Sequence, residues 1–174
     1  VHGLPEARRM ALQLGLRFLD GVEISVSWDG ITIHVVGLNI DPTHPQLLTG
    51  LESVRAGRTL RAEQMAADLA RIGIGGSFEG ALAFAGNKDM VSRTHFARFL
   101  VDSGKVKDIK AAFKKYLVKG KPGYVPHQWA ELNDAVGWIR AAGGRAVLAH
   151  PGRYEIGKAR MLRLLTDFKA AGGE

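Results

Sequence analysis

Apolar and polar residues alternate with a period of two in two Val- and Ile-rich runs, at 17–25 and 31–38. This period is typical of β-strands with one buried face. Asp29 and Gly30 stand between the runs, and an Asp-Gly pair in this position is a strong signal for a two-residue hairpin turn. The pattern therefore predicts a β-hairpin early in the chain.

Most of the remaining chain has the spacing of apolar residues, and the residues at segment ends, that are typical of helices. The predicted helices cover residues 4–14, 51–72, 93–102, 107–118, 131–142 and 158–171. Ser92 precedes the third of them and is a preferred residue for capping a helix start. A short apolar run at 145–149 is typical of a buried parallel strand. This order of elements indicates an α/β domain that carries a helical insertion.

The hairpin brings a carboxylate and an imidazole together. With Asp29 and Gly30 as the turn, Glu23 pairs with Val36, and His34 is its diagonal neighbour on the same face. Such neighbours lie about 7–8 Å apart between backbone positions, so the long side chains can converge on one ion. The opposite face is wholly apolar and is expected to pack on the core. A solvated polar face on an edge hairpin is the alternative explanation.

A second candidate position follows the apolar run 145–149. His150 stands at the end of that expected strand, where the catalytic residues of α/β barrels gather. Pro151 stiffens the exit, and Gly152 allows a close backbone approach. Arg153 can hold a phosphate by two parallel hydrogen bonds. An ordinary strand-to-helix turn, with His150 as a capping residue, is the alternative.

Composition and charge restrict the chemistry further. The 174-residue chain has no cysteine, so any metal site must use His, Asp and Glu. Its net charge of +7 favours anionic partners such as phosphates or nucleic acid, although scattered lysines would give the same sum. No run approaches the ~20 apolar residues of a membrane span, and no signal-peptide pattern is present. We expect no membrane partner and a cytoplasmic location; the sequence does not indicate an oligomeric state.

Arginines of the longest predicted helix are candidate substrate ligands. Arg55, Arg58 and Arg61 recur every three residues and therefore lie on one broad stripe of that helix. Such a stripe suits the binding of a phosphate group. A solvated cationic helix face is the alternative explanation for the stripe taken alone.

The start of the helix after Ser92 is a second candidate for binding an anion. A helix amino terminus offers free N–H groups and the positive end of the helix dipole. Arg93 and Thr94 add donors at this point, and His95 lies beside them. We predict that all three contact the substrate, with local packing or capping as the alternative role of His95.

Three short motifs, in this order, resemble successive motifs of the polymerase-and-histidinol-phosphatase (PHP) phosphoesterases. They are Gly21-Val22-Glu23-Ile24-Ser25, Ile33-His34-Val35-Val36-Gly37 and Ala149-His150-Pro151-Gly152-Arg153-Tyr154. Two further segments resemble the subgroup that hydrolyses nucleoside 3′,5′-bisphosphates and trims short oligonucleotides from the 5′ end. These are Arg93-Thr94-His95-Phe96-Ala97-Arg98 and Gly120-Lys121-Pro122-Gly123-Tyr124-Val125-Pro126. The resemblance covers almost the whole chain.

The resemblance implies a fold, a domain order and a cofactor. The fold is a distorted (β/α)7 barrel, of which this chain is expected to be a fragment. Residues 1–50, with a helix and the hairpin, and residues 129–174 would be barrel segments, whereas 51–128 would be a mostly helical insertion that binds substrate. Two or three divalent ions are implied for the complete domain, Mn first and Fe, Zn or Mg as alternatives.

The resemblance also implies roles for three residues and exposes several departures. Glu23, His34 and His150 match metal ligands, which act in catalysis through the metals, and Glu23 matches a ligand that bridges two ions. The family's early His-x-His, the Asp after it, the His of an Asp-His-Asp motif and a late Asp-x-His have no counterpart in the chain. We therefore expect residues 1–174 alone to hold an incomplete metal cluster and to show little turnover.

The expected function is metal-dependent hydrolysis of phosphate esters in nucleotides. The substrates implied are 3′,5′-nucleoside bisphosphates, short oligonucleotides cut from the 5′ end, or both. Two alternatives stay open: a nucleic-acid-binding module without catalysis, and a degenerate PHP domain with a structural role. The basic helices would explain a protein that only binds nucleic acid. They would not explain the presence of Glu23, His34 and His150.

Overall fold

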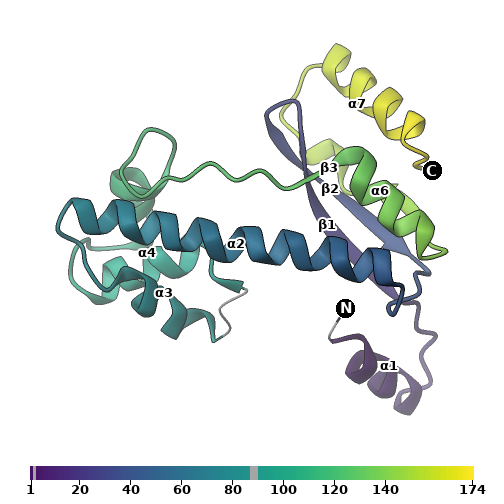
Figure 1. Ribbon diagram of the computed structural model, residues 1–174, viewed down its shortest axis with the longest axis horizontal. Coiled ribbons are helices and arrows are strands. Elements are labelled where there is room, and N and C mark those ends of the chain that lie inside the picture. Colours follow the sequence, from purple (N-terminus) through teal and green to yellow (C-terminus); the bar gives the residue numbers. More distant parts are fainter. Residues whose placement is uncertain (2, 87–89) are drawn as a thin grey trace. The chain divides into compact units, whose positions relative to one another are not determined.

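A computed structural model of the chain describes residue 1, residues 3–86 and residues 90–174 (Figure 1). Its helices are α1 (Leu4–Gln13), α2 (Pro45–Arg71), α3 (Ser77–Ala85), α4 (Arg93–Asp102), α5 (Ile109–Ala112), α6 (Leu132–Ala141) and α7 (Lys158–Ala170). Its strands are β1 (Gly21–Trp28), β2 (Ile31–Leu38), β3 (Ala130–Glu131) and β4 (Arg145–Leu148). The chain is thus a mixed α/β protein, and it divides into two compact units, residues 1–52 with 129–174, and residues 53–128.

The hairpin has the predicted register. Trp28 pairs with Ile31, and Glu23 pairs with Val36. Asp29 adopts φ 47° and Gly30 adopts φ 76°, the positive values that this turn requires at both central residues. β1 begins at Gly21 and runs on to Trp28, rather than covering 17–25, because pairing continues up to the turn.

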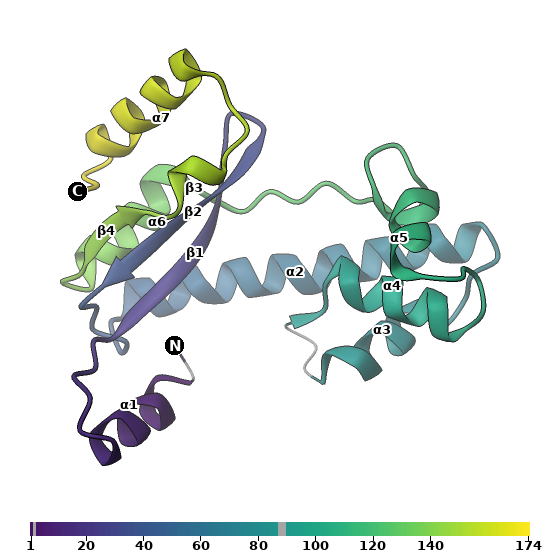
Figure 2. The ribbon, with the colours of Figure 1, turned by 180° about the vertical axis from the view of Figure 1, so that it is seen from behind.

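The sheet has the order β3-β1-β2-β4, and its four strands lie side by side in Figure 2. β3 pairs with β1 in parallel, whereas β4 pairs with β2 antiparallel, with Val147 opposite Val36. The prediction of a parallel strand at 145–149 was therefore wrong about the pairing. β4 does run in the same direction as β1, but its hydrogen-bonded neighbour is the returning strand of the hairpin. An apolar run indicates that a strand is buried, but it does not identify the strand with which it pairs.

One face of the hairpin carries the core of this unit, as predicted. Its buried side chains are Ile24, Val26, Ile33 and Val35. α6 covers this face with Ala135, Val136 and Ile139, and Gly37 allows the approach, because a Cβ at Gly37 would lie 2.9 Å from Ile139 Cγ1. The polar face therefore points the other way and is available for chemistry.

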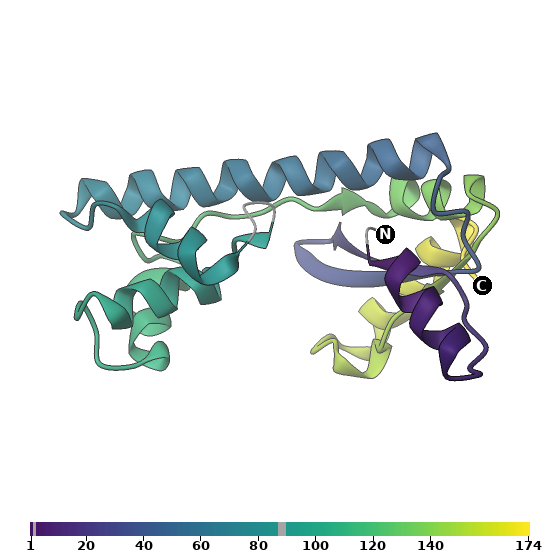
Figure 3. The same ribbon diagram turned by 90° about the horizontal axis from the view of Figure 1, so that it is seen from below.

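α2 starts at Pro45, six residues before the predicted start at 51, and forms one continuous helix (Figure 3). Gly50 lies inside it, although glycine weakens a helix interior by about 1 kcal/mol relative to alanine. The reason is packing against α6, since a Cβ at Gly50 would lie 2.3 Å from Cδ2 of Trp138. Gly50 is therefore required by the packing of α2 against α6.

α7 is tied to the tip of the hairpin. Arg160 Nε lies 2.6 Å from Asp29 Oδ2, and Arg163 also bonds Asp29. Trp28 Nε1 donates to Asp167 Oδ2 at 2.9 Å. These contacts join the turn between β1 and β2 to a helix far along the chain and so restrain the hairpin.

Residues 53–128 have a helical core of their own. The carboxyl-terminal half of α2 contributes Met65 and Leu69, and α4 contributes Phe96 and Leu100. α4 has the predicted bounds, 93–102, and α3 was not singled out by the sequence pattern.

The helix expected over 107–118 is interrupted. α5 begins at Ile109 because the Asp108 carboxylate accepts a hydrogen bond from Ala111 N–H at 2.7 Å. After α5 the chain widens into a π-helical turn at Phe113–Leu117, closed by the N–H of Val118 donating to Phe113 C=O at 3.2 Å. Within the described parts of the chain, none of the helices has the length and apolarity needed to cross a membrane.

Candidate metal centre

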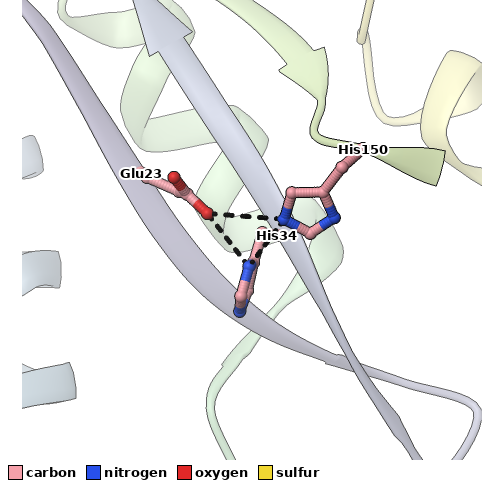
Figure 4. A group of neighbouring side chains, drawn as sticks. All are labelled: Glu23, His34 and His150. Atoms are coloured by element: carbon pink, nitrogen blue, oxygen red, sulfur yellow. Dashed lines mark hydrogen bonds and ion pairs between the residues drawn. The ribbon is translucent and has the colours of Figure 1, made fainter. Parts of the chain in front are cut away.

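Glu23 on β1, His34 on β2 and His150 just after β4 converge on the polar face of the sheet (Figure 4). Glu23 Oε1 lies 2.9 Å from His34 Nδ1 and 3.7 Å from His150 Nε2. The two imidazole nitrogens lie 3.2 Å apart. The convergence expected from the hairpin register and from the strand-end position of His150 is therefore present.

The strand pairing explains how His150 reaches the hairpin. Leu148 pairs with Val35, and the N–H of Ala149 donates to His34 C=O at 2.9 Å, so β4 delivers the chain beside His34. His150 then takes a left-handed backbone conformation, with φ 33° and ψ 54°. Residues other than glycine rarely adopt it, at a cost of about 1–3 kcal/mol. This turn points the imidazole back toward Glu23 and His34 (Figure 4).

The geometry fits metal ligands. Two ligands at 2.0–2.2 Å from one ion lie roughly 3–3.5 Å apart for tetrahedral or octahedral angles, close to the three distances measured here. His34 Nδ1 faces both Glu23 and His150, and a single N–H cannot satisfy both. One carboxylate and two imidazoles suit Mn, Fe or Zn better than Mg, which prefers oxygen ligands.

The site is open to solvent. The side chains of His34 and His150 are each 35% exposed, and that of Glu23 is 53% exposed. A substrate oxygen or a water molecule can therefore reach the point on which they converge. Arg153 lies in the 3₁₀ turn after His150, with an exposed side chain, and its N–H donates to His150 C=O at 2.9 Å.

A cationic group lies within residues 53–128. Arg58 and Arg61 on α2 are half-buried, and burial lowers the pKa of both. Burial is the first cause for Arg61, and the charges of Arg93 and Arg58 lower its pKa further. Arg61 Nε donates to Val125 C=O at 2.8 Å, which orients the guanidinium. Three like charges thus gather on one part of this unit.

Two ring side chains line the same group. The guanidinium of Arg93 lies 5.9 Å from the ring centre of Tyr124. Burial, with the charges of Arg61 and Arg58, lowers the pKa of His127 to about 4, so its imidazole is neutral at pH 7. Sequence reasoning did not include these two residues in the site. Gly57 inside α2 was the sequence feature that could have pointed to His127. A glycine there leaves space for the imidazole, since a Cβ at Gly57 would lie 3.3 Å from His127 Cε1.

The other predicted substrate ligands have different surroundings. Arg55 is half-buried one turn before Arg58, and in the described residues no interaction joins it to the cationic group. Thr94 is exposed at the start of α4. His95 Nδ1 accepts the N–H of Ser92 at 3.2 Å, so this nitrogen caps the helix. The contact of His95 with substrate stays a prediction that only its other nitrogen can fulfil.

Comparison with known proteins identifies relatives over nearly the whole chain. It is 59% identical over 172 residues to the "3′,5′-nucleoside bisphosphate phosphatase" of Chromobacterium violaceum, covering 99% of this chain and 60% of that protein. It is 42% identical over 174 residues to the "5′-3′ exoribonuclease" of Haemophilus influenzae, covering 100% of this chain and 63% of that protein. The chain therefore spans about three fifths of the length of these relatives. No family model matches.

Two solved structures share the fold. An amidohydrolase from Chromobacterium violaceum, with bound sulfate and no metal, has a TM-score of 0.87 and 58% identity over 99% of this chain and 61% of that one. A proposed metal-dependent phosphoesterase from Bifidobacterium adolescentis has a TM-score of 0.77 and 24% identity with the same coverage, which shows likeness of fold alone. The chain is thus a homologue of proteins named bisphosphate phosphatase and 5′-3′ exoribonuclease, and its resemblance to the PHP-type phosphoesterases is confirmed.

Proposed function

We propose that the complete protein is a metal-dependent phosphoesterase that hydrolyses nucleotide phosphate esters, with Glu23, His34 and His150 as metal ligands. The observation that carries the proposal is the convergence of one carboxylate oxygen and two imidazole nitrogens within 2.9–3.7 Å of one another. The names of the relatives, a bisphosphate phosphatase and an exoribonuclease, support the reaction class. The substrates that we propose are 3′,5′-nucleoside bisphosphates and short oligonucleotides cut from the 5′ end.

The three residues would hold divalent ions, with Mn favoured and Fe, Zn or Mg as alternatives. Bound ions of this kind supply a water molecule of lowered pKa and neutralise charge on the phosphate. The chain's own part is to fix the ligand atoms. Glu23 and His34 are fixed by the hairpin register, and His150 by the turn after β4. Because Glu23 Oε1 faces both imidazoles, Glu23 would hold an ion together with each of them.

The cationic group of Arg58, Arg61 and Arg93 supports a role in holding a substrate phosphate. All three arginines are half-buried, and the charges of Arg58 and Arg93 repel that of Arg61. An anion bound among the three guanidinium groups would relieve this repulsion. Guanidinium groups bind phosphate oxygens by paired, charge-assisted hydrogen bonds. The imidazole of His127 is neutral, so it could form a hydrogen bond to a phosphate without adding to the repulsion among the arginines. We assign Arg55, Thr94, His95 and Arg153 as further candidate substrate contacts.

For the complete protein we propose a (β/α)7 barrel, to which residues 1–50 and 129–174 contribute, with 51–128 as a substrate-binding insertion. The mixed sheet and the separate helical core support this division. The reaction would take place in the cytoplasm.

The decisive experiment uses the full-length protein. It is stripped of metal, reconstituted with Mn²⁺ and assayed for phosphate release from a nucleoside 3′,5′-bisphosphate and for mononucleotide release from a 5′-phosphorylated trinucleotide. Turnover that requires metal and disappears in His34→Ala is the expected result. Binding of both substrates without metal-dependent release would contradict the proposal and favour a binding module. Absence of both metal binding and substrate binding would favour a structural role.

A further inference from the structure

The hydroxyl of Tyr154 lies between the two chain segments that carry the imidazoles. It accepts the backbone N–H of His34 at 2.8 Å and donates to the backbone C=O of Ala149 at 2.9 Å. Both of its partners are backbone groups, and each belongs to or adjoins a proposed metal ligand. Tyr154 has no role in the function proposed so far.

The strand register shows which backbone hydrogen bond the hydroxyl of Tyr154 replaces. β4 pairs with β2 up to Leu148 opposite Val35, so the next pair in the register is Ala149 opposite His34. In a hydrogen-bonded antiparallel pair the two residues exchange both N–H···O=C bonds. Here the N–H of Ala149 donates directly to His34 C=O at 2.9 Å, but the return bond passes through the hydroxyl of Tyr154. The hydroxyl is therefore inserted into the ladder at the point where β4 ends.

The same residue contacts the side chain of the next ligand. The rings of Tyr154 and His150 meet edge to face, with centres 5.5 Å apart and an interplanar angle of 64°. The turn Pro151–Arg153 brings the tyrosine back to this place, and the N–H of Tyr154 donates to Pro151 C=O at 3.2 Å. Tyr154 therefore touches the backbone of His34 through its hydroxyl and the imidazole of His150 through its ring.

We propose that Tyr154 is a positioning residue of the metal centre, an inference that rests on the function proposed above. Its hydroxyl sets the separation of the backbones at His34 and Ala149, and its ring limits the rotation of the His150 imidazole. His150 needs such support because its left-handed backbone is unfavourable for a residue other than glycine. Without the hydroxyl, either two backbone groups lose their partner or the ladder closes and displaces His150.

The test is Tyr154→Phe in the full-length protein, which keeps the ring and removes the hydroxyl. Tyr116→Phe is the matched control, since Tyr116 is buried in the helical core of residues 53–128. Metal-free protein is titrated with Co²⁺, and both the affinity and the visible absorption bands of the bound ion are recorded. Residues that orient metal ligands typically contribute about 10- to 100-fold in affinity. We expect a loss of that size in Tyr154→Phe with altered bands, and neither change in Tyr116→Phe.

The outcomes separate the two proposals. Equal affinity and an unchanged spectrum in Tyr154→Phe would overturn the positioning role and leave the proposed function intact. A wild-type protein that binds no metal would overturn both. A purely structural role would lower the melting temperature of Tyr154→Phe without changing the bands of the ion that it binds, and this would also overturn the inference.

A second measurement covers the case in which Tyr154→Phe does not fold. In the metal-free wild-type protein, hydrogen exchange at the backbone amide of His34 is followed by NMR, with the amide of Gly30 at the hairpin turn as the reference. The bridge predicts an amide of His34 that exchanges far more slowly than that of Gly30. Equally fast exchange at the two amides would overturn the inference without any substitution.

Discussion

Glu23 Oε1 and His34 Nδ1 lie 2.9 Å apart, although the two residues are diagonal neighbours on different strands. Their contact follows from the alternation of faces along β1 and β2, which places both side chains on the polar side of the hairpin. His150 joins them from the turn after β4, far along the chain, with Nε2 at 3.7 Å from the same carboxylate oxygen. The carboxylate is therefore the common partner of both imidazoles.

Replacing Glu23 by glutamine is expected to weaken metal binding. The substitution keeps the size of the side chain but replaces a charged oxygen ligand by a neutral one. We expect at least about tenfold weaker Mn²⁺ affinity in calorimetry, because even residues that only orient ligands contribute about 10- to 100-fold. Glu52→Gln is the control, because Glu52 is exposed on α2, and this variant should bind Mn²⁺ as the wild type does. Wild-type affinity in Glu23→Gln would exclude Glu23 as a ligand.

Replacing Arg93 by alanine is expected to change which substrate is accepted. Hydrogen bonds to charged groups contribute about 1.5–3 kcal/mol, so kcat/KM for a 3′,5′-bisphosphate should fall roughly ten- to hundredfold. A substrate without the 5′-phosphate should lose little, whereas His34→Ala should abolish turnover of both.

Arg98→Ala is the control for the loss of one positive charge from α4. Arg98 is exposed, and its guanidinium lies 4.8 Å from the ring centre of Phe84. Its kcat/KM should stay near that of the wild type on both substrates. Equal losses on the two substrates for Arg93→Ala would remove the phosphate-binding role of Arg93, whatever the outcome at the metal centre.

His127 is expected to make stability depend on pH. Its pKa in the folded protein is about 4, against 6.5 for an ordinary histidine, with burial as the first cause and Arg61 and Arg58 as the next. As the pH falls below about 6.5, the unfolded chain takes up a proton that the folded protein takes up only near pH 4, so the free energy of unfolding decreases across this window. NMR titration of the imidazole and urea unfolding at several pH values measure the two effects.

Two variants test the causes of this shift. Arg61→Gln should raise the pKa of His127 part of the way toward 6.5, because one repelling charge is removed while the burial remains. His127→Asn should flatten the decrease in stability between pH 6.5 and 4. An imidazole that titrates near 6.5 in the wild-type protein would show that the burial described here is wrong.

Two glycines in helices are expected to respond to alanine in opposite directions. At Gly50 the added methyl would lie 2.3 Å from the ring of Trp138, whereas at Gly137 in α6 nothing lies within 4 Å. Overpacking typically costs about 1–3 kcal/mol, and alanine gains about 1 kcal/mol over glycine inside a helix. Gly137→Ala should therefore raise the melting temperature, and Gly50→Ala should lower it. A stabilised Gly50→Ala protein would show that Trp138 does not pack against α2 as described.

The sequence by itself determined the hairpin, its register and the face on which Glu23 and His34 meet. The reason is that alternation along a strand and the Asp29-Gly30 turn act between residues that are close in sequence. The bounds of α4 were predictable on the same grounds, because Ser92 caps the helix start locally. The motifs around Glu23, His34 and His150 also pointed to the phosphoesterase relatives before any distance was known.

Only the tertiary structure decided the partner of β4, the start of α2 and the grouping of the arginines. Burial of Ala146 and Leu148 is compatible with several neighbours in a sheet. The antiparallel pairing with β2 depends on contacts across more than a hundred residues. The first turns of α2, with Gly50, pack against Trp138 of α6, a contact that the local sequence pattern does not show. The bridge from Tyr154 to His34 is of the same kind, since a hydroxyl inserted between two strands exists only once both strands are in place.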